Sequence, residues 1–112
     1  MNTLEKTNIK QIVDLLTGTY AVERVYLFGS RARGNSRDDS DYDLLIVSDD
    51  PRLASLRPRR RITEIFRLFF RKVRVPMDVI VRTGEEFRRL SAASITLDNT
   101  VLKEGIVLYA HE

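Results

Sequence analysis

The sequence of 112 residues contains no cysteine and a single histidine, His111. Disulfide bonds and thiolate metal sites are therefore excluded, and the lack of cysteine agrees with a reducing compartment. His111 stands beside Glu112, where one imidazole makes no metal site. Any metal ion must therefore be held by carboxylate and other oxygen ligands.

Long apolar runs are also missing. No stretch approaches the roughly 20 residues that a helix needs to cross a bilayer, and Met1–Lys6 lacks the basic start and the apolar segment of a signal peptide. These absences predict a cytoplasmic protein with no membrane contact. Because 43% of the residues are hydrophobic and no repeat or linker is visible, residues 1–112 are expected to fold as a single domain.

Acidic residues are scarce between Arg52 and Arg74, where Glu64 is the single acid among many arginines. The whole chain has a net charge of +3, so its positive excess is concentrated in this segment. Such a segment can meet a phosphate backbone or an acidic protein, and it can equally be a solvated helix face, because arginine is a good helix former. The sequence leaves direct nucleic-acid binding open.

Gly29 is the most informative of the five glycines, because it ends the strand-like apolar run Val25–Phe28. Without a Cβ, Gly29 lets a phosphate come close to the backbone. Ser30 is well suited to begin a short helical turn, whose free N–H groups attract anions. The Ser30 hydroxyl adds another donor. The alternative is an ordinary strand-to-helix turn, since glycine and serine are common there.

Asp41 and Asp43 stand at the start of a second apolar run, Leu44–Val47. Side chains alternate along a strand, so both carboxylates are predicted to leave the same face about 6.6 Å apart. That separation suits joint binding of Mg²⁺, and two Mg²⁺ ions can clamp the attacking and leaving oxygens of a phosphoryl displacement. The alternative is a turn that caps the strand. Together with Gly29 and Ser30, the pair indicates a nucleotidyl-transfer site.

A third carboxylate, Asp78, interrupts an apolar run that is predicted to form a later strand. A lone carboxylate is costly to bury without a partner, so its position needs a reason. It could lie at an exposed edge, pair with an arginine, or join Asp41 and Asp43 as a third metal ligand. We favour the third interpretation, because a neighbouring strand would complete the oxygen shell of the cation.

The spacing of these motifs resembles that of a known family. Gly29 and Ser30, ten intervening residues, and Asp41-Tyr42-Asp43 match the signature of the DNA polymerase β-like nucleotidyltransferase superfamily. The chain length, the Gly-Ser-Arg-Ala-Arg-Gly sequence and the ending from Asn99 to Tyr109 are similar to its minimal nucleotidyltransferase (MNT) branch.

Hydrophobic periodicity and turn residues predict the remaining elements. Helices are expected near 8–17, 58–72, 84–90 and 95–103, with a helical turn at 31–33, and strands near 25–28, 44–47, 73–81 and 106–109. In the second helix, the predicted core stripe is Ile62, Ile65, Phe66 and Phe69, with the arginines opposite. Together with the resemblance, this order predicts an α+β fold: a small mixed sheet of about four strands with helices packed mainly on one face.

The resemblance also implies an activity and residue roles. It implies a Mg²⁺-dependent enzyme that moves a nucleoside monophosphate, most simply AMP from ATP, to a hydroxyl and releases pyrophosphate. Gly29 and Ser30 would hold the β and γ phosphates, and Asp41 and Asp43 would bind two Mg²⁺ ions. Asp78 would bind the catalytic ion and could accept the proton of the attacking hydroxyl.

Arg31 and Arg33 lie close in sequence to this phosphate site. Guanidinium forks suit phosphate oxygens, so both residues are candidates for nucleotide binding, and both could instead pair with nearby carboxylates.

The resemblance implies a partner as well. Free-standing MNT proteins often act as antitoxins of helical HEPN toxins, so a HEPN protein is the expected acceptor. Two alternatives remain open: nucleotidyl transfer to a small molecule by a homodimer, and a non-catalytic module that only binds a nucleotide or a partner.

Overall fold

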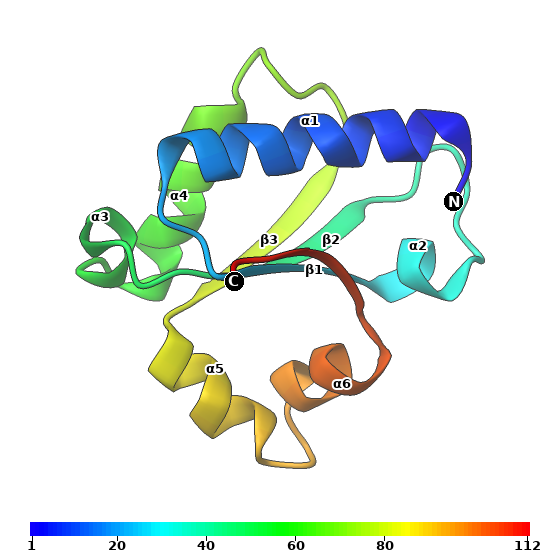
Figure 1. Cartoon of the computed structure of the whole chain (residues 1–112). Coiled ribbons are helices and arrows are strands. Elements are labelled where there is room, and N and C mark those ends of the chain that lie inside the picture. The colour runs from blue at the N-terminus through cyan, green and yellow to red at the C-terminus, as the bar shows by residue number, and fades with distance from the viewer.

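A computed structural model describes the whole chain, residues 1–112, as four strands and six helices. The helices are α1 (Thr3–Thr19), α2 (Gly29–Arg33), α3 (Pro51–Ala54), α4 (Pro58–Phe69), α5 (Gly84–Ser91) and α6 (Leu97–Glu104), and the strands are β1 (Arg24–Phe28), β2 (Tyr42–Val47), β3 (Met77–Arg82) and β4 (Ile106–Ala110) (Figure 1). Only the short helix α3 has no counterpart in the sequence-based expectation. None of the helices combines the length and the apolar character needed to span a bilayer.

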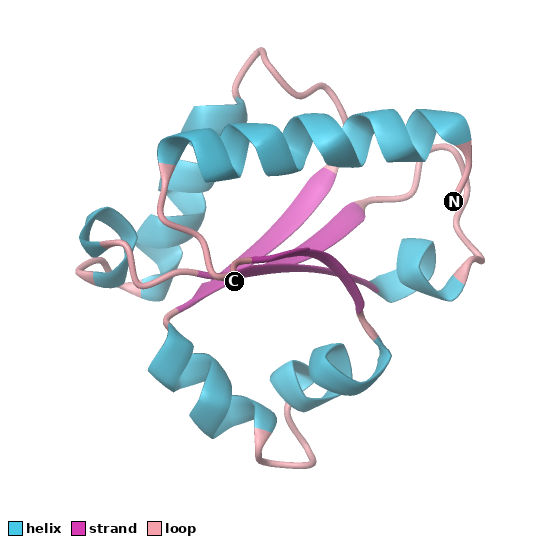
Figure 2. Ribbon diagram, in the orientation of Figure 1, coloured by secondary structure: helices cyan, strands magenta, loops and turns pink.

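The four strands form one mixed sheet (Figure 2), and their order is β3-β2-β1-β4. Strand β1 runs antiparallel to β2 and β4, whereas β2 and β3 are parallel. Asp43 lies opposite Phe28 of β1 on one side and opposite Asp78 of β3 on the other. The end of β1 and the beginnings of β2 and β3 therefore meet at one end of the sheet, where α2 follows β1.

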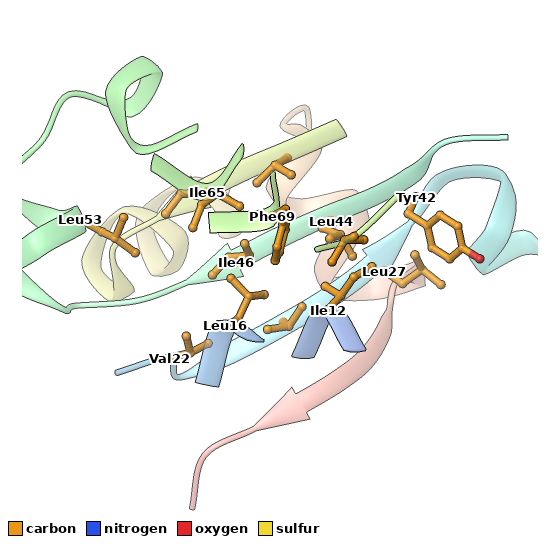
Figure 3. Packing of buried hydrophobic residues seen from close by; sticks show 14 residues of the cluster. Ile12, Leu16, Val22, Leu27, Tyr42, Leu44, Ile46, Leu53, Ile65 and Phe69 are labelled. Carbon is orange, nitrogen blue, oxygen red and sulfur yellow. The ribbon is translucent and has the colours of Figure 1, made fainter. Parts of the chain in front are cut away.

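The larger helical layer packs on one face of the sheet and forms the main core (Figure 3). Ile12 and Leu16 of α1, Ile65 and Phe69 of α4, and Leu44 of β2 are all buried there. Helices α1 and α4 have an apolar side at these positions, so burying it against the strands is the main source of stability in this half of the protein.

A smaller layer, α5 and α6, covers the opposite face of the sheet. Its cluster joins Tyr26, Leu45 and Val47 of the strands to Phe87 of α5 and Val101 of α6. The predicted α+β fold with a four-stranded mixed sheet is confirmed. The helices were expected mainly on one face, and the structure divides them into this smaller layer and the larger one formed by α1, α3 and α4.

Some local boundaries differ from the sequence-based expectation. Helix α1 begins before Asn8, because Asn2 caps it: Asn2 Oδ1 accepts from the Glu5 N–H at 2.8 Å, and Glu5 Oε1 accepts from the Asn2 N–H at 3.1 Å. Gly18 lies inside this helix instead of ending it.

The predicted core stripe of α4 is partly wrong. Ile65 and Phe69 are buried as expected, but Phe66 is 41% exposed. Arg61, expected on the outer side, is buried instead. Its guanidinium satisfies backbone carbonyls that no apolar side chain could satisfy, which is why an arginine belongs there.

Candidate active site

The predicted carboxylates gather where the end of β1 meets the starts of β2 and β3. Asp43 of β2 is paired directly with Asp78 of the parallel strand β3. Register partners on neighbouring strands lie about 4.8 Å apart and point to the same face. This is the face covered by α5 and α6, because Leu45 and Val47 of β2 pack there. Asp41 directly precedes β2, two residues before Asp43.

The carboxylates interact electrostatically. Burial is the largest cause that raises the pKa of Asp43, repulsion by the carboxylates of Asp78 and Asp41 raises it further, and the positive charge of Arg33 opposes the increase. None of the three carboxylates belongs to an ion pair of the chain. By contrast, the buried carboxylates of Glu5, Asp50 and Asp98 are each paired with an arginine.

This donor set suits a hard divalent cation in ligand type. All donors are carboxylate oxygens, and two of them come from adjacent strands in register. No three acidic or histidine side chains are already arranged as a metal cluster. Asp41 and Asp78 are exposed, so their carboxylates are free to turn toward a shared ion.

Gly29 fits against the carboxylate of Asp43. Its φ of +72° lies in the left-handed region, which glycine adopts without a steric penalty. A Cβ at this position would overlap Asp43 Oδ2 and would lie 3.0 Å from Asp43 Cγ. Glycine is therefore required at position 29 for two reasons: the backbone turn needs a positive φ, and the Asp43 carboxylate occupies the space of a Cβ.

Ser30 follows Gly29 in the first turn of α2, and Gly34 closes the helix with a φ of +79°. A hollow of about 110 Å³ lies beside this turn, between α2 and α6, and its lining includes Gly29 and Arg33. Arg33 is exposed and close enough to Asp43 to affect its titration. The structure thus places Gly29 and Arg33 at one hollow next to the carboxylates.

Arg31 has a different role from the predicted one. Its side chain is buried, and its Nη1 forms an ion pair with Glu5 Oε2 at 2.8 Å. Its Nε and Nη2 donate to the carbonyl oxygen of Ser40, and Nη2 also donates to the carbonyls of Arg37 and Asp38. This corrects the prediction that Arg31 binds phosphates, because its donors are already used to hold the loop between α2 and β2.

Tyr42 anchors the other face of the site. Its hydroxyl accepts a hydrogen bond from Asn8 Nδ2 at 3.0 Å, and the Arg31 guanidinium lies 4.0 Å from its ring centroid. The Tyr42 N–H also donates to the Pro76 carbonyl at 2.9 Å, which joins the start of β2 to the segment before β3. Asn8, Arg31 and Tyr42 therefore fix the positions of Asp41 and Asp43 on either side of Tyr42.

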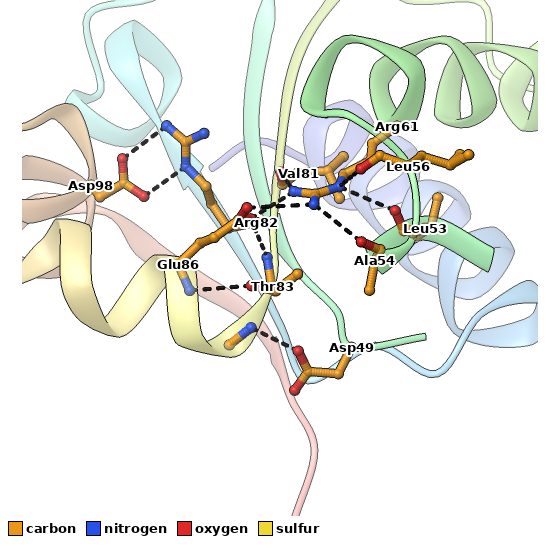
Figure 4. Close-up of polar contacts among 11 residues, drawn as sticks. Asp49, Leu53, Ala54, Leu56, Arg61, Val81, Arg82, Thr83, Glu86 and Asp98 are labelled. Atoms are coloured by element: carbon orange, nitrogen blue, oxygen red, sulfur yellow. Dashed lines mark hydrogen bonds and ion pairs between the residues drawn. The ribbon is translucent and has the colours of Figure 1, made fainter. Parts of the chain in front are cut away.

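Two ion pairs hold α5 and α6 against the sheet (Figure 4). Arg82 at the end of β3 forms a bidentate pair with Asp98 of α6, with Nε to Oδ2 at 2.9 Å and Nη2 to Oδ1 at 3.1 Å. Arg61 of α4 pairs with Glu86 of α5 at 2.6 Å and donates to the Val81 carbonyl at 3.2 Å. Their partners lie 16 to 25 residues away, so sequence reasoning missed both pairs.

Comparison with known proteins identifies relatives of this chain. The family model described as polymerase beta, nucleotidyltransferase matches residues 10–112. A protein of Methanocaldococcus jannaschii, described as a "putative protein adenylyltransferase", is 31% identical over 107 residues, which cover 94% of this chain and 98% of that protein.

Solved structures share the fold. A toxin-antitoxin complex with AMP-PNP contains a chain that superposes with a TM-score of 0.66 at 22% identity, covering 94% of this chain and 75% of that one. A second complex pairs a tri-AMPylated HEPN toxin of Shewanella oneidensis with an MNT antitoxin. The matched chain of this complex superposes with a TM-score of 0.60 at 20% identity, and the match covers 95% of this chain and 72% of the matched chain.

Proposed function

This chain belongs to the polymerase beta nucleotidyltransferase family, and on that premise we propose that it is a Mg²⁺-dependent enzyme that transfers AMP from ATP to a hydroxyl of a HEPN-type protein. The observation that carries the proposal is the set of Asp41, Asp43 and Asp78 beside the turn at Gly29. Three like charges without arginine partners are costly in a purely structural role, since burial, and after it the repulsion by Asp78 and Asp41, raises the pKa of Asp43.

The triphosphate would lie along the turn between β1 and α2. Gly29 permits close approach of a phosphate to the backbone, and the Ser30 hydroxyl and the exposed Arg33 guanidinium supply donors to the β and γ phosphates. The Arg31 guanidinium is buried and bonded to Glu5 and to the Ser40 carbonyl, so in this proposal it acts by holding the loop that ends at Asp41.

Asp41, Asp43 and Asp78 would hold the Mg²⁺ ions. When bound, Mg²⁺ neutralises the triphosphate and the three carboxylates, which otherwise repel one another, and it stabilises charge on the reacting oxygens. Asp43, the most enclosed of the three, gains most from this neutralisation.

In the proposed reaction, the acceptor hydroxyl oxygen forms a bond to the α-phosphorus of ATP. The bond from that phosphorus to the oxygen bridging the α and β phosphates breaks, and pyrophosphate leaves with the electron pair. The hydroxyl proton passes to the carboxylate of Asp78, which is exposed on the edge strand β3 and therefore open to an incoming acceptor.

The proposed acceptor is supported by the relatives. One relative is described as a protein adenylyltransferase, and one structural neighbour is an MNT antitoxin bound to an AMPylated HEPN toxin. A macromolecular acceptor also suits the shape of this site, because the hollow beside Gly29, about 110 Å³, is far too small to enclose a second substrate together with ATP.

Intact-mass measurement of a co-expressed HEPN-type partner tests this proposal. We expect the partner to gain one or more AMP masses on a hydroxyl side chain, and Asp41→Asn with Asp43→Asn to abolish the gain while the complex still forms. Asp38→Asn with Asp39→Asn is the matched control, because it removes the same charge from exposed residues of the adjacent loop. A double variant at Asp41 and Asp43 that protects against the partner as well as the wild type would show that binding, not catalysis, neutralises the partner.

A further inference from the structure

The outward side of α4 and the turn after it form a surface that the nucleotidyl-transfer site does not use. We call it the α4 basic surface and define it by the exposed side chains of Arg59, Arg60, Phe66, Arg67, Phe70 and Arg71. Phe70 is 68% exposed and Phe66 is 41% exposed, which is unusual for large aromatic side chains.

Positive charge on this surface is largely uncompensated. The segment Arg52–Arg74 holds eight arginines and one lysine against one acid, Glu64. Its positive charge exceeds the net charge of +3 of the whole chain, so the rest of the chain is net negative. Arg52 and Arg61 are held in close ion pairs elsewhere. On the surface itself, only Arg67 approaches the acid of this segment, Glu64, at the loose distance of 3.8 Å.

The two phenylalanines form a pair of exposed rings. Phe66 and Phe70 are four residues apart at the end of α4, so they are neighbours on one side of the helix. The Arg71 guanidinium lies 5.3 Å from the Phe70 ring centroid. Arg71 is also the one non-glycine residue with a positive φ, +63°, a backbone state that disfavours arginine sterically.

An open groove lies beside the turn that carries Lys72, the residue after Arg71. It has a volume of about 600 Å³, lies between α1 and the turn after α4, and is lined by Lys10, Gln11 and Lys72 among others. Gln11 Nε2 donates to the Lys72 carbonyl at 2.6 Å, which fixes the turn that carries Arg71. The groove lining also includes Asp14, whose carboxylate pairs with Lys10 Nζ at 2.8 Å, so Lys72 is the lysine of the groove that has no ion pair.

We propose that the α4 basic surface, together with this groove, binds single-stranded RNA. Guanidinium groups bind phosphates and stack on bases, and exposed aromatic rings stack on bases of any sequence. The surface has one loosely placed acid among its arginines, so its charge is complementary to a polyanion such as a phosphate backbone. Unpaired bases are needed for stacking on Phe66 and Phe70, which excludes a duplex, and most free single strands in a cell are RNA.

This surface is independent of the proposed active site. Helix α4 lies on the opposite face of the sheet from α5 and α6, toward which Asp43 points. RNA and ATP would therefore not compete for one site. Failure of AMP transfer leaves this inference untouched, and failure of RNA binding leaves the proposed transferase activity untouched.

Fluorescence anisotropy with a labelled RNA of about 12 nucleotides tests the inference at about 0.15 M salt. We expect a Kd between about 1 and 100 μM. Phe66→Ala with Phe70→Ala should weaken binding at least about 30-fold, and the salt dependence of binding should not change. Arg67→Gln with Arg71→Gln should weaken binding and lower the slope of log K against log salt by about 1.4, or 0.7 per charge.

Arg88→Gln with Arg89→Gln is the matched control for charge, because these exposed arginines of α5 lie on the other layer. This control should leave RNA affinity within about twofold, and thermal unfolding of each variant establishes that it is folded. The inference is overturned by absence of RNA binding, by equal loss in the control, or by tighter binding to duplex, to single-stranded DNA of the same sequence, or to vesicles of anionic lipid.

Discussion

Substitution of Gly29 by alanine separates the space needed by Asp43 from the backbone conformation of the turn. Gly29 and Gly34 both have positive φ, +72° and +79°, at the two ends of α2. A Cβ at Gly34 meets nothing within 4 Å, whereas a Cβ at Gly29 overlaps the Asp43 carboxylate. Gly34→Ala therefore measures the backbone effect alone, and Gly29→Ala adds displacement of the carboxylate.

The expected magnitudes follow from this difference. A left-handed backbone costs alanine about 1–2 kcal/mol, partly offset by the lower entropy of its unfolded chain, so Gly34→Ala should lower the free energy of unfolding by about 1 kcal/mol. Gly29→Ala should lower it by about 1–3 kcal/mol more, because Asp43 must move to relieve the overlap. A displacement of about 1 Å at a reacting centre is expected to reduce the transfer rate about 100-fold.

Two assays on the same preparations test this expectation: AMP transfer to the partner, and affinity for AMP-PNP in Mg²⁺ by calorimetry. Gly34→Ala should keep both within about twofold, and Gly29→Ala should lose both. Equal activity of the two variants would refute the reasoning, because it would mean that the carboxylate packed on Gly29 is not used.

Three further predictions concern charged groups. Asp43→Asn should raise the free energy of unfolding at pH 7 in metal-free buffer and should abolish AMP transfer. Burial raises the pKa of Asp43, so the ionised carboxylate destabilises the folded chain at pH 7. In thermal unfolding, the stability difference between the variant and the wild type should vanish as the pH falls below about 4. Arg31→Ala should lower the free energy of unfolding by about 3–5 kcal/mol in urea titrations, because it leaves the buried carboxylate of Glu5 without its positively charged partner. A loss below about 1 kcal/mol would contradict this. Asp50→Asn should be less stable than the wild type at pH 7, because hydrogen bonds from Arg52 hold the pKa of Asp50 far below its usual range. The difference in the free energy of unfolding should narrow below about pH 4. A difference that does not depend on pH would refute this role of Arg52.

The local parts of the fold follow directly from the sequence. Val25–Phe28, the turn at Gly29 and the run after Asp43 are marked by patterns within a few residues, so strands β1 and β2 and helix α2 are predictable. The capping box of Thr83 and Glu86 likewise marks the start of α5. The placement of Asp78 beside Asp43 needs only the additional inference that β3 adjoins β2.

The roles of the arginines could not be predicted in this way. Arg31 and Arg61 look like exposed helix residues in the sequence, but both are buried because carbonyl groups converge on them. Arg61 reaches the Val81 carbonyl, 20 residues away, and such a contact exists only in the folded chain. Phe66 is exposed for the opposite reason, since no element of the fold covers its side of α4.

The most direct test of the proposed active site is the anomalous diffraction of Mn²⁺ in a crystal of this protein soaked with Mn²⁺ and AMP-PNP. The predicted result is an anomalous peak coordinated by carboxylate oxygens of Asp41, Asp43 and Asp78, with the β and γ phosphates at Gly29 and Ser30. A nucleotide and metal bound elsewhere, or a peak at this site that Asp43 and Asp78 do not coordinate, would contradict the assignment.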